Sequence, residues 1–277
     1  MGPGRHDEPG RRPQARDGHH RLHGAQGVPA GRGRRRVTTG VLLLHGSSGT
    51  PDLERARILE AEGYDVLAPR WTVREEVALD SFPLDELAAR NDRLVVMGSS
   101  WGAEAALLLG ALDERVDAVI AFAPGAYVWG RFVENGSQRP AWTWHGEPLP
   151  FVPSDPDWKA YDDPPSFVGW YRQSLKRYAA EAEAARIPVE RIRGEVLLIA
   201  GGDDKVWPST EFADEIVRRR GERTTRVVAL PAAGHRTVLP GEQPKTAGQR
   251  MARGGTEEAD RELGALAWPE IRKVLAG

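Results

Sequence analysis

The chain has 277 residues, 40% of them hydrophobic and 28% charged, and its formal net charge is −2. This length can bury the core of one large α/β domain, and the small net charge gives no strong attraction to nucleic acid or to an anionic membrane. The sequence has no cysteine and no apolar run near 18 residues, which excludes disulfides, a cysteine nucleophile and a membrane-spanning helix and is consistent with a cytoplasmic protein.

Residues 1–36 differ in composition from the rest of the chain. They contain nine arginines, three acidic residues and four of the seven histidines, with almost no apolar side chains. Such a segment cannot form a packed core, and we expect a disordered basic tail. Binding to nucleic acid is the alternative role, but no aromatic residues are interleaved for base stacking, so we expect no nucleic-acid partner.

From residue 37 onward, short apolar runs alternate with segments of helical periodicity. These runs have the length and composition of strands that are buried on both faces. They are 41–44, 64–68, 94–97, 116–123, 196–200 and 225–230. The alternation predicts one domain over 37–277, with a mostly parallel sheet and helices on both faces.

Several segments carry helix signals. The first helix is expected to have Thr50 as its N-cap and Pro51 as its first helical residue. A shorter helix is expected near 84–89, another from Ser209, and the last after Thr256 as N-cap.

Residues 125–190 interrupt this alternation with many prolines and five of the nine tryptophans. A loop region of this length is either functional or disordered, and so many aromatic side chains argue against disorder. We expect a lid insertion over an apolar substrate site, with Trp129, Trp142 and Trp144 against the substrate and a helix over 171–186. The alternative is that these rings only cover one face of the sheet.

A glycine–serine motif joins the predicted strand 94–97 to a helix-forming segment. Its sequence is Gly98-Ser99-Ser100-Trp101-Gly102. The spacing Gly-x-Ser-x-Gly is typical of a sharp strand-to-helix turn that exposes the serine hydroxyl and leaves no room for side chains at the flanking positions. Ser100 is therefore the candidate nucleophile.

A serine nucleophile requires a base, and the base requires an acidic partner. Asp203 and Asp204 follow the strand 196–200, and His235 follows the strand 225–230. Serine, aspartate and histidine, each after a strand and in this chain order, are typical of α/β-hydrolases. We therefore expect His235 as the base and one of the two aspartates as its partner.

The reaction also requires two donors for an oxyanion. The backbone N–H groups of Trp101, after the nucleophile, and of Ser47, after the first predicted strand, occupy the usual places. The alternative for the turn at Ser47 is a plain connection between strand and helix. No histidine and carboxylate cluster has the spacing of metal ligands, and no phosphate loop or dinucleotide fingerprint is present, so we expect no metal and no cofactor.

Three motifs together resemble a known family, the acyl-CoA thioesterases and bile acid-CoA:amino acid N-acyltransferases, in their C-terminal catalytic domain. The motifs are Gly98-x-Ser100-x-Gly102-Ala103-Glu104, Gly202-Asp203-Asp204-x-x-Trp207-x-Ser209 and Ala233-Gly234-His235. The resemblance extends from about Gly40 to the C-terminus and implies the α/β-hydrolase fold. It also implies that Ser100, Asp204 and His235 form the triad. Because the acyltransferase branch uses a cysteine nucleophile, the serine favours hydrolysis.

The leading expectation is a serine hydrolase that cleaves acyl thioesters such as acyl-CoA, or acyl esters, through an acyl-enzyme. A dienelactone-hydrolase-like or general carboxylesterase is the alternative, because fold and triad do not separate these activities. A non-catalytic binding protein on the same fold is the third possibility.

Overall fold

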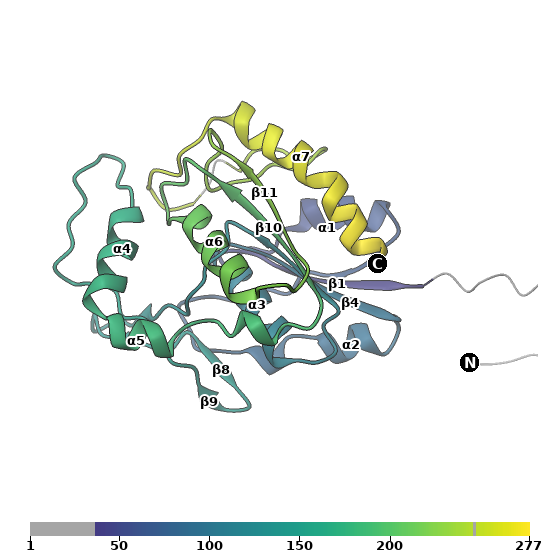
Figure 1. Ribbon diagram of the computed structural model, residues 1–277, viewed down its shortest axis with the longest axis horizontal. Coiled ribbons are helices and arrows are strands. Elements are labelled where there is room, and N and C mark those ends of the chain that lie inside the picture. The colour runs from purple at the N-terminus through teal and green to yellow at the C-terminus, as the bar shows by residue number, and fades with distance from the viewer. Residues whose placement is uncertain (1–36, 246–247) are drawn as a thin grey trace, which may run out of the picture. The chain divides into compact units, whose positions relative to one another are not determined.

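The computed structural model describes residues 37–245 and 248–277 (Figure 1). These residues belong to one compact unit, Val37–Gly277. The expectation of a disordered basic tail over residues 1–36 lies outside the described part of the chain.

A six-stranded sheet forms the centre of the domain, and its strands are parallel, as the apolar runs predict. The strand order is β11-β10-β5-β4-β1-β2. The strands are β1 (Thr39–Leu44), β2 (Asp65–Leu67), β4 (Arg93–Ser99), β5 (Ala118–Phe122), β10 (Glu195–Gly201) and β11 (Thr225–Leu230). From β1 the chain first adds β2 on one side and then β4 on the other, so the order reverses between β1 and β4. In open α/β sheets, ligands bind beyond the carboxyl ends of the strands at such a point.

Helices cover both faces of the sheet. Side chains of α1 (Leu53–Ala61) and α7 (Glu257–Ala276) belong to the apolar cluster on one face. The cluster on the other face contains side chains of α2 (Leu84–Ala88), α3 (Trp101–Leu112) and α6 (Ser209–Arg220). Alternate residues of the central strands enter the two clusters, as a pleated strand buried on both faces requires.

The starts of α2, α6 and α7 agree with the sequence signals, and the start of α1 does not. Helix α6 begins at Ser209, and α7 follows Thr256, whose hydroxyl accepts a hydrogen bond from the Ala259 backbone N–H at 3.1 Å. Helix α1 begins at Leu53 rather than at Pro51. Its N-cap residue is Asp52, whose carboxylate does not cap the helix but forms ion pairs with Arg55 and Lys245.

The region 125–190 contains short strands and helices rather than one long loop. Strand β3 (Val77–Ala78) pairs with β8 (Trp142–Trp144), which pairs with β9 (Glu147–Pro148), while β6 (Arg131–Phe132) and β7 (Gln138–Arg139) form a hairpin. The helix expected over 171–186 is two helices, α4 (Val168–Arg177) and α5 (Ala179–Ala184), because Tyr178 between them has a non-helical backbone (φ −110°, ψ 50°). Two 3₁₀ turns, η1 (Leu79–Ser81) and η2 (Val189–Arg191), complete the elements.

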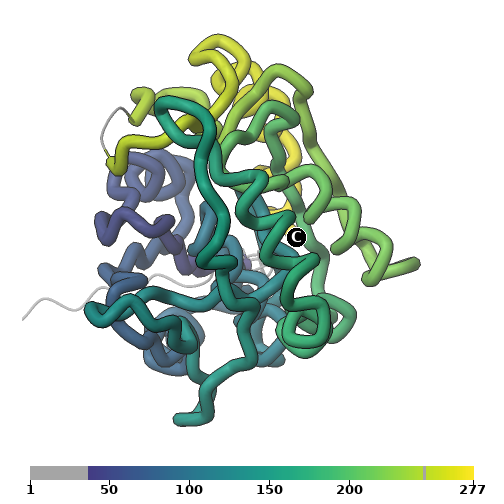
Figure 2. Tube along the Cα trace, turned by 90° about the vertical axis from the view of Figure 1, so that its left-hand side faces the viewer, coloured from purple at the N-terminus to yellow at the C-terminus, as the bar shows by residue number. Residues whose placement is uncertain are grey.

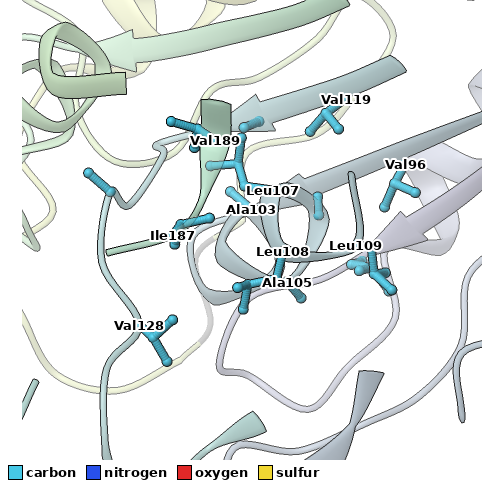
Figure 3. Packing of buried hydrophobic residues seen from close by; sticks show 14 of the residues in the cluster. Val96, Ala103, Ala105, Leu107, Leu108, Leu109, Val119, Val128, Ile187 and Val189 are labelled. Atoms are coloured by element: carbon cyan, nitrogen blue, oxygen red, sulfur yellow. The ribbon is translucent and has the colours of Figure 1, made fainter. Parts of the chain in front are cut away.

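This insertion lies at the carboxyl ends of the sheet strands. In Figure 1, β1 runs from the right toward the side of the molecule that carries α4 and α5, and in Figure 2 the teal segments of the insertion lie in front. The backbone N–H of Phe167, just before α4, donates to the carbonyl of Lys205 in the loop after β10 at 2.8 Å. Figure 3 shows the other anchor, where Val128, Ile187 and Val189 pack against side chains of α3.

Candidate active site

Ser100 lies in a strained turn between β4 and α3. Its φ of 57° and ψ of −121° are unusual for a residue with a side chain, and its N–H donates to the carbonyl of Phe122 on β5 at 2.9 Å. A Cβ atom at Gly98 would lie 2.0 Å from the carbonyl oxygen of Gly102, and one at Gly102 would lie 2.4 Å from that of Leu44. Both glycines of the motif are therefore sterically required, and the hydroxyl of Ser100 is presented at the switch point of the sheet.

The structure brings Ser100, His235 and Asp204 together. Nε2 of His235 lies 2.9 Å from Oγ of Ser100, and Nδ1 of His235 lies 2.8 Å from Oδ2 of Asp204. The three residues come from the ends of β4, β11 and β10, where the sequence pattern expects them. This arrangement has the geometry expected of a nucleophile, a base and an orienting acid.

The carboxylate of Asp204 is held on both oxygens. Oδ1 accepts from the backbone N–H of Val206 at 2.8 Å and of Trp207 at 3.3 Å, and Oδ2 accepts from the hydroxyl of Ser209 at 2.8 Å. The ring of Trp207, which is fully buried, stands edge-on to the His235 imidazole, with centroids 5.9 Å apart. The block Asp-Asp-x-x-Trp-x-Ser therefore holds the carboxylate of Asp204 and contacts one side of the His235 imidazole.

Asp203 points away from His235. Its carboxylate pairs with the ammonium of Lys205 at 2.7 Å and accepts from the backbone N–H of Gly255 at 2.8 Å, and the side chain is 42% exposed. The Lys205 ammonium lowers the pKa of Asp203, and the Gly255 N–H acts in the same direction. Of the two adjacent aspartates, only Asp204 contacts the imidazole.

The turn after β1 lies beside Ser100. A Cβ at Gly46 would be 3.4 Å from Cβ of Ser100. His45 stacks on Trp71 at 4.8 Å, and its Nδ1 and Nε2 contact the Gly46 carbonyl at 2.6 Å and the Trp71 N–H at 3.4 Å. Burial lowers the pKa of His45, so the imidazole is neutral and orients this turn.

The two expected oxyanion donors occupy suitable places in the backbone. Trp101 is the first residue of α3, so its N–H has no acceptor within the helix. Ser47 lies in the exposed turn next to Gly46. Their assignment as oxyanion donors remains a prediction.

The structure places the three expected lid tryptophans in different surroundings. Trp129 and Trp142 are almost completely buried, and the Trp142 ring lies 6.4 Å from the ring of Trp101. Trp144 is half-buried and lines a cavity of about 400 Å³ together with His145 and residues in and just before α2. Ser100, Asp204 and His235 do not line this cavity. Only Trp142 is thus linked through a ring contact to a residue of the nucleophile turn.

Sequence reasoning left Glu104 without a role. This residue lies one helical turn after Ser100, is fully buried, and accepts hydrogen bonds from Nε1 of Trp142 at 2.7 Å and the backbone N–H of Trp129 at 3.1 Å. Burial raises its pKa to about 8, so the carboxyl is mostly protonated at neutral pH. The sequence offered one sign of such a role, because Glu104 is an acidic residue within the otherwise apolar segment 103–109.

Within residues 37–245 and 248–277, no group of three or more histidine, cysteine and carboxylate side chains could hold a metal ion. In the same residues no helix has both the length and the apolar character that are needed to cross a membrane.

Two proteins of Mus musculus are similar to this chain in sequence. Bile acid-CoA:amino acid N-acyltransferase of Mus musculus is 25% identical over 278 residues, which cover 92% of this chain and 63% of the relative. Peroxisomal succinyl-coenzyme A thioesterase of Mus musculus is 28% identical over 94 residues, 31% of this chain and 22% of the relative. The chain therefore spans less than two thirds of the length of these relatives.

Among solved structures, a Klebsiella pneumoniae protein with a provisional dienelactone hydrolase name matches with a TM-score of 0.50 and 15% identity over 89% of each chain. At this identity the match shows the fold alone, and that fold is the expected one.

The family model described as BAAT / Acyl-CoA thioester hydrolase C terminal matches residues 84–275, which include Ser100, Asp204 and His235. The resemblance carried by the sequence motifs is thereby confirmed. The chain has the α/β-hydrolase fold and belongs to the BAAT / acyl-CoA thioester hydrolase C-terminal family.

Proposed function

We propose that this protein is a serine hydrolase that cleaves acyl thioesters such as acyl-CoA, or acyl esters, through an acyl-enzyme on Ser100. The observation that carries the proposal is the continuous hydrogen-bonded series from Asp204 through His235 to Ser100, with distances of 2.8 and 2.9 Å. The strained backbone of Ser100 supports it, because such conformations cluster at active sites.

The proposed reaction has two halves. In the first, Nε2 of His235 takes the proton of Ser100 as Oγ attacks the acyl carbonyl carbon, and Asp204 stabilises the imidazolium. The N–H groups of Trp101 and Ser47 stabilise the oxyanion. Cleavage of the bond to sulfur or oxygen releases the leaving group, which receives the proton from His235. In the second half, His235 deprotonates a water that attacks the acyl-enzyme, and Ser100 recovers its proton as the acid is released.

The family supports a thioester as the substrate. Two of its relatives carry names that refer to CoA thioesters, one an acyltransferase and one a thioesterase. A serine nucleophile, in place of the cysteine of the acyltransferase branch, favours water as the acyl acceptor. Oxygen esters remain the second candidate class, because the same relay acts on either acyl carbonyl.

We further propose that the insertion 125–190 forms the lid over the acyl site. It joins the acid loop through Phe167 and through the hydroxyl of Ser166, which also donates to the Lys205 carbonyl, at 3.0 Å. It reaches the nucleophile helix through the hydrogen bonds of Trp129 and Trp142 with Glu104. A lid in contact with both loops can respond to a bound acyl chain.

Labelling with a fluorophosphonate probe tests the mechanism, and hydrolysis of a panel of acyl-CoA and p-nitrophenyl esters tests the substrate class. We expect labelling of the wild type and none of Ser100→Ala, with the highest kcat/KM on an acyl-CoA. Labelling that persists in Ser100→Ala would refute the nucleophile. The absence of both labelling and turnover in the wild type would favour a binding protein on a hydrolase fold.

A further inference from the structure

Arg55 is a buried cation that no part of the proposed mechanism uses. It lies on α1, with 3% of its surface exposed, on the apolar helix face that also carries Ala56 and Leu59. Arginine is almost never so fully buried unless it is paired, and this one contacts three segments at the carboxyl edge of the sheet, the ends of β4 and β5 and the connection between β11 and α7.

The guanidinium of Arg55 makes four hydrogen bonds. Nε and Nη2 donate to the two carboxylate oxygens of Glu242 at 2.6 and 2.9 Å. Nη1 donates to the hydroxyl of Ser99 at 3.2 Å, and Nη2 also donates to the carbonyl of Thr237 at 3.1 Å. Ser99 immediately precedes Ser100, and Thr237 is two residues after His235.

The guanidinium also lies over the ring of Phe122, 4.3 Å from its centroid. The carbonyl of Phe122 is the acceptor for the N–H of Ser100, at 2.9 Å. Arg55 therefore contacts the residue before the nucleophile and the residue that holds the nucleophile's N–H.

The charge of Arg55 is balanced within the same cluster. Glu242, with 4% of its surface exposed, also accepts from the backbone N–H of Leu239 at 2.8 Å, so its carboxylate holds the histidine loop as well as the arginine. Asp52 lies 3.8 Å from Nε of Arg55, and its own carboxylate pairs with Lys245. Burial alone would lower the pKa of Arg55, but the Glu242 carboxylate opposes this, and the net pKa lies above its usual range.

We propose that Arg55 is a positioning residue that sets the placement of Ser100 relative to His235, by tying the nucleophile turn and the histidine loop to helix α1 through Ser99, Thr237 and Glu242. This inference rests on the proposed serine hydrolase function. Arg55 does not touch the reacting atoms; its role is to keep the Nε2–Oγ contact at hydrogen-bonding distance.

The geometry requires an arginine rather than any cation. The planar guanidinium binds both oxygens of Glu242 and still has donors for Ser99 and Thr237. A lysine would keep the charge, but a single ammonium cannot donate to Glu242 through two parallel bonds and reach the other two acceptors. Arg55→Lys therefore separates the geometric role from the neutralisation of Glu242.

Arg220 provides a matched control, because it is also an almost fully buried arginine. It donates to the carbonyls of Val189, Ile192, Gly194 and Thr224 and to the hydroxyl of Thr225. These acceptors lie near the start of β10 and β11, at the end of the sheet away from Ser100. Arg220→Lys should lower Tm without moving the triad.

The experiment compares Arg55→Lys, Arg220→Lys and wild type well below their melting temperatures, by the rate of fluorophosphonate labelling per folded molecule and by steady-state kinetics on a p-nitrophenyl ester. For Arg55→Lys we expect labelling and kcat to fall by about 10- to 100-fold, because a displacement of about 1 Å at a reacting centre can cost this much. KM should change less than about threefold, since Arg55 contacts no substrate. Arg220→Lys should label within about twofold of wild type.

A second measurement does not depend on activity. The proton on Nδ1 of His235, bonded to Asp204, should give a far-downfield NMR resonance, and Arg55→Lys should shift or broaden it while Arg220→Lys leaves it in place. If wild type is neither labelled nor active, the proposed function fails, and this resonance still decides the positioning role. An unmoved resonance and a wild-type labelling rate in Arg55→Lys would show that Arg55 only stabilises the fold.

If Arg55→Lys does not fold, Ser99→Ala removes one acceptor of Arg55 and leaves the charge pair with Glu242 intact. We then expect labelling to fall by about three- to tenfold with Tm nearly unchanged. An unchanged labelling rate and an unmoved His235 resonance in this variant would overturn the proposal.

Discussion

At the scale of single residues, the site depends on which of two similar neighbours faces the imidazole. Ser99 and Ser100 are adjacent, as are Asp203 and Asp204, yet only Ser100 and Asp204 contact His235. Next to the strained Ser100, the side chain of Ser99 contacts Arg55. In the turn after β10, the side chain of Asp203 contacts Lys205. Each pair therefore supplies its own matched control.

Ser100→Ala should lower kcat/KM by a factor of about 10³ to 10⁶, because the nucleophile is lost while oxyanion and binding contacts remain. Ser99→Ala should stay within about tenfold of wild type, since it removes only one of the acceptors of Arg55. Hydrolysis rates at equal concentrations of folded protein measure both. Similar losses in the two variants would exclude Ser100 as the nucleophile.

Asp204→Asn should approach the loss seen for His235→Ala, because an amide at this position no longer holds the Nδ1 proton of the base. The same acid-to-amide change in the triad of a serine protease costs about 10⁴ in kcat. Asp203→Asn should stay within about tenfold of wild type, because its partners are Lys205 and Gly255. The rates must be compared between variants of similar thermal stability. A larger loss of activity in Asp203→Asn than in Asp204→Asn would refute the assignment of Asp204 as the acid.

Among the elements, helix α3 connects Ser100, the candidate nucleophile, to the insertion. Its first turn carries Ser100 as N-cap and Glu104 inside the helix, and Glu104 holds the segments of Trp129 and Trp142. Because the buried carboxyl of Glu104 accepts both hydrogen bonds, the connection between α3 and the insertion is sensitive to the ionisation of Glu104.

Stability should depend on pH through Glu104. Burial raises its folded pKa from 4.5 to about 8, so between these values the folded protein retains a proton that the unfolded chain has lost. The free energy of unfolding therefore falls as pH rises through this window and levels off above it. In Glu104→Gln, which stays neutral, Tm should fall less between the two ends of the window than in the wild type. Equal slopes in thermal melts of both proteins would contradict the raised pKa.

The two neighbouring tryptophans of β8 should differ in their effect on stability. Trp142 has no exposed surface and donates to Glu104, so Trp142→Ala should lower the free energy of unfolding by about 3–5 kcal/mol. Trp144→Ala should cost clearly less, since Trp144 is half-buried. Urea titration gives both values, and relative rates across acyl lengths show whether either ring also selects substrate. An equal cost would mean that Trp144 belongs to the core.

At the scale of the whole molecule, the parts of the fold that followed from the sequence are those fixed by local pattern. Apolar runs gave the strands of the main sheet, and the chain order of Ser, Asp and His after three of these strands gave the candidate site. The choice of Asp204 over Asp203 came from the family resemblance. The short strands β3 and β8 could not be predicted, because Val77 pairs with the distant Trp142 and two- to three-residue strands carry no periodicity.

The charged residues inside the helices were the other omission. Arg55 and Glu104 lie on buried helix faces, and their partners come from segments far along the chain, Glu242 and Trp142. Helical periodicity identifies the buried face but not the tertiary contact that permits a charge there. An unexpected charge on an apolar helix face is therefore a sign of a tertiary contact with a distant segment.

Rapid-quench mass spectrometry of the protein mixed with an acyl-CoA or an activated ester tests whether an acyl group is transferred to Ser100. We expect a transient mass increase equal to one acyl group, located on the peptide that contains Ser100 and absent in Ser100→Ala. Turnover with no adduct in the wild type, or an adduct that persists at another residue in Ser100→Ala, would contradict the account.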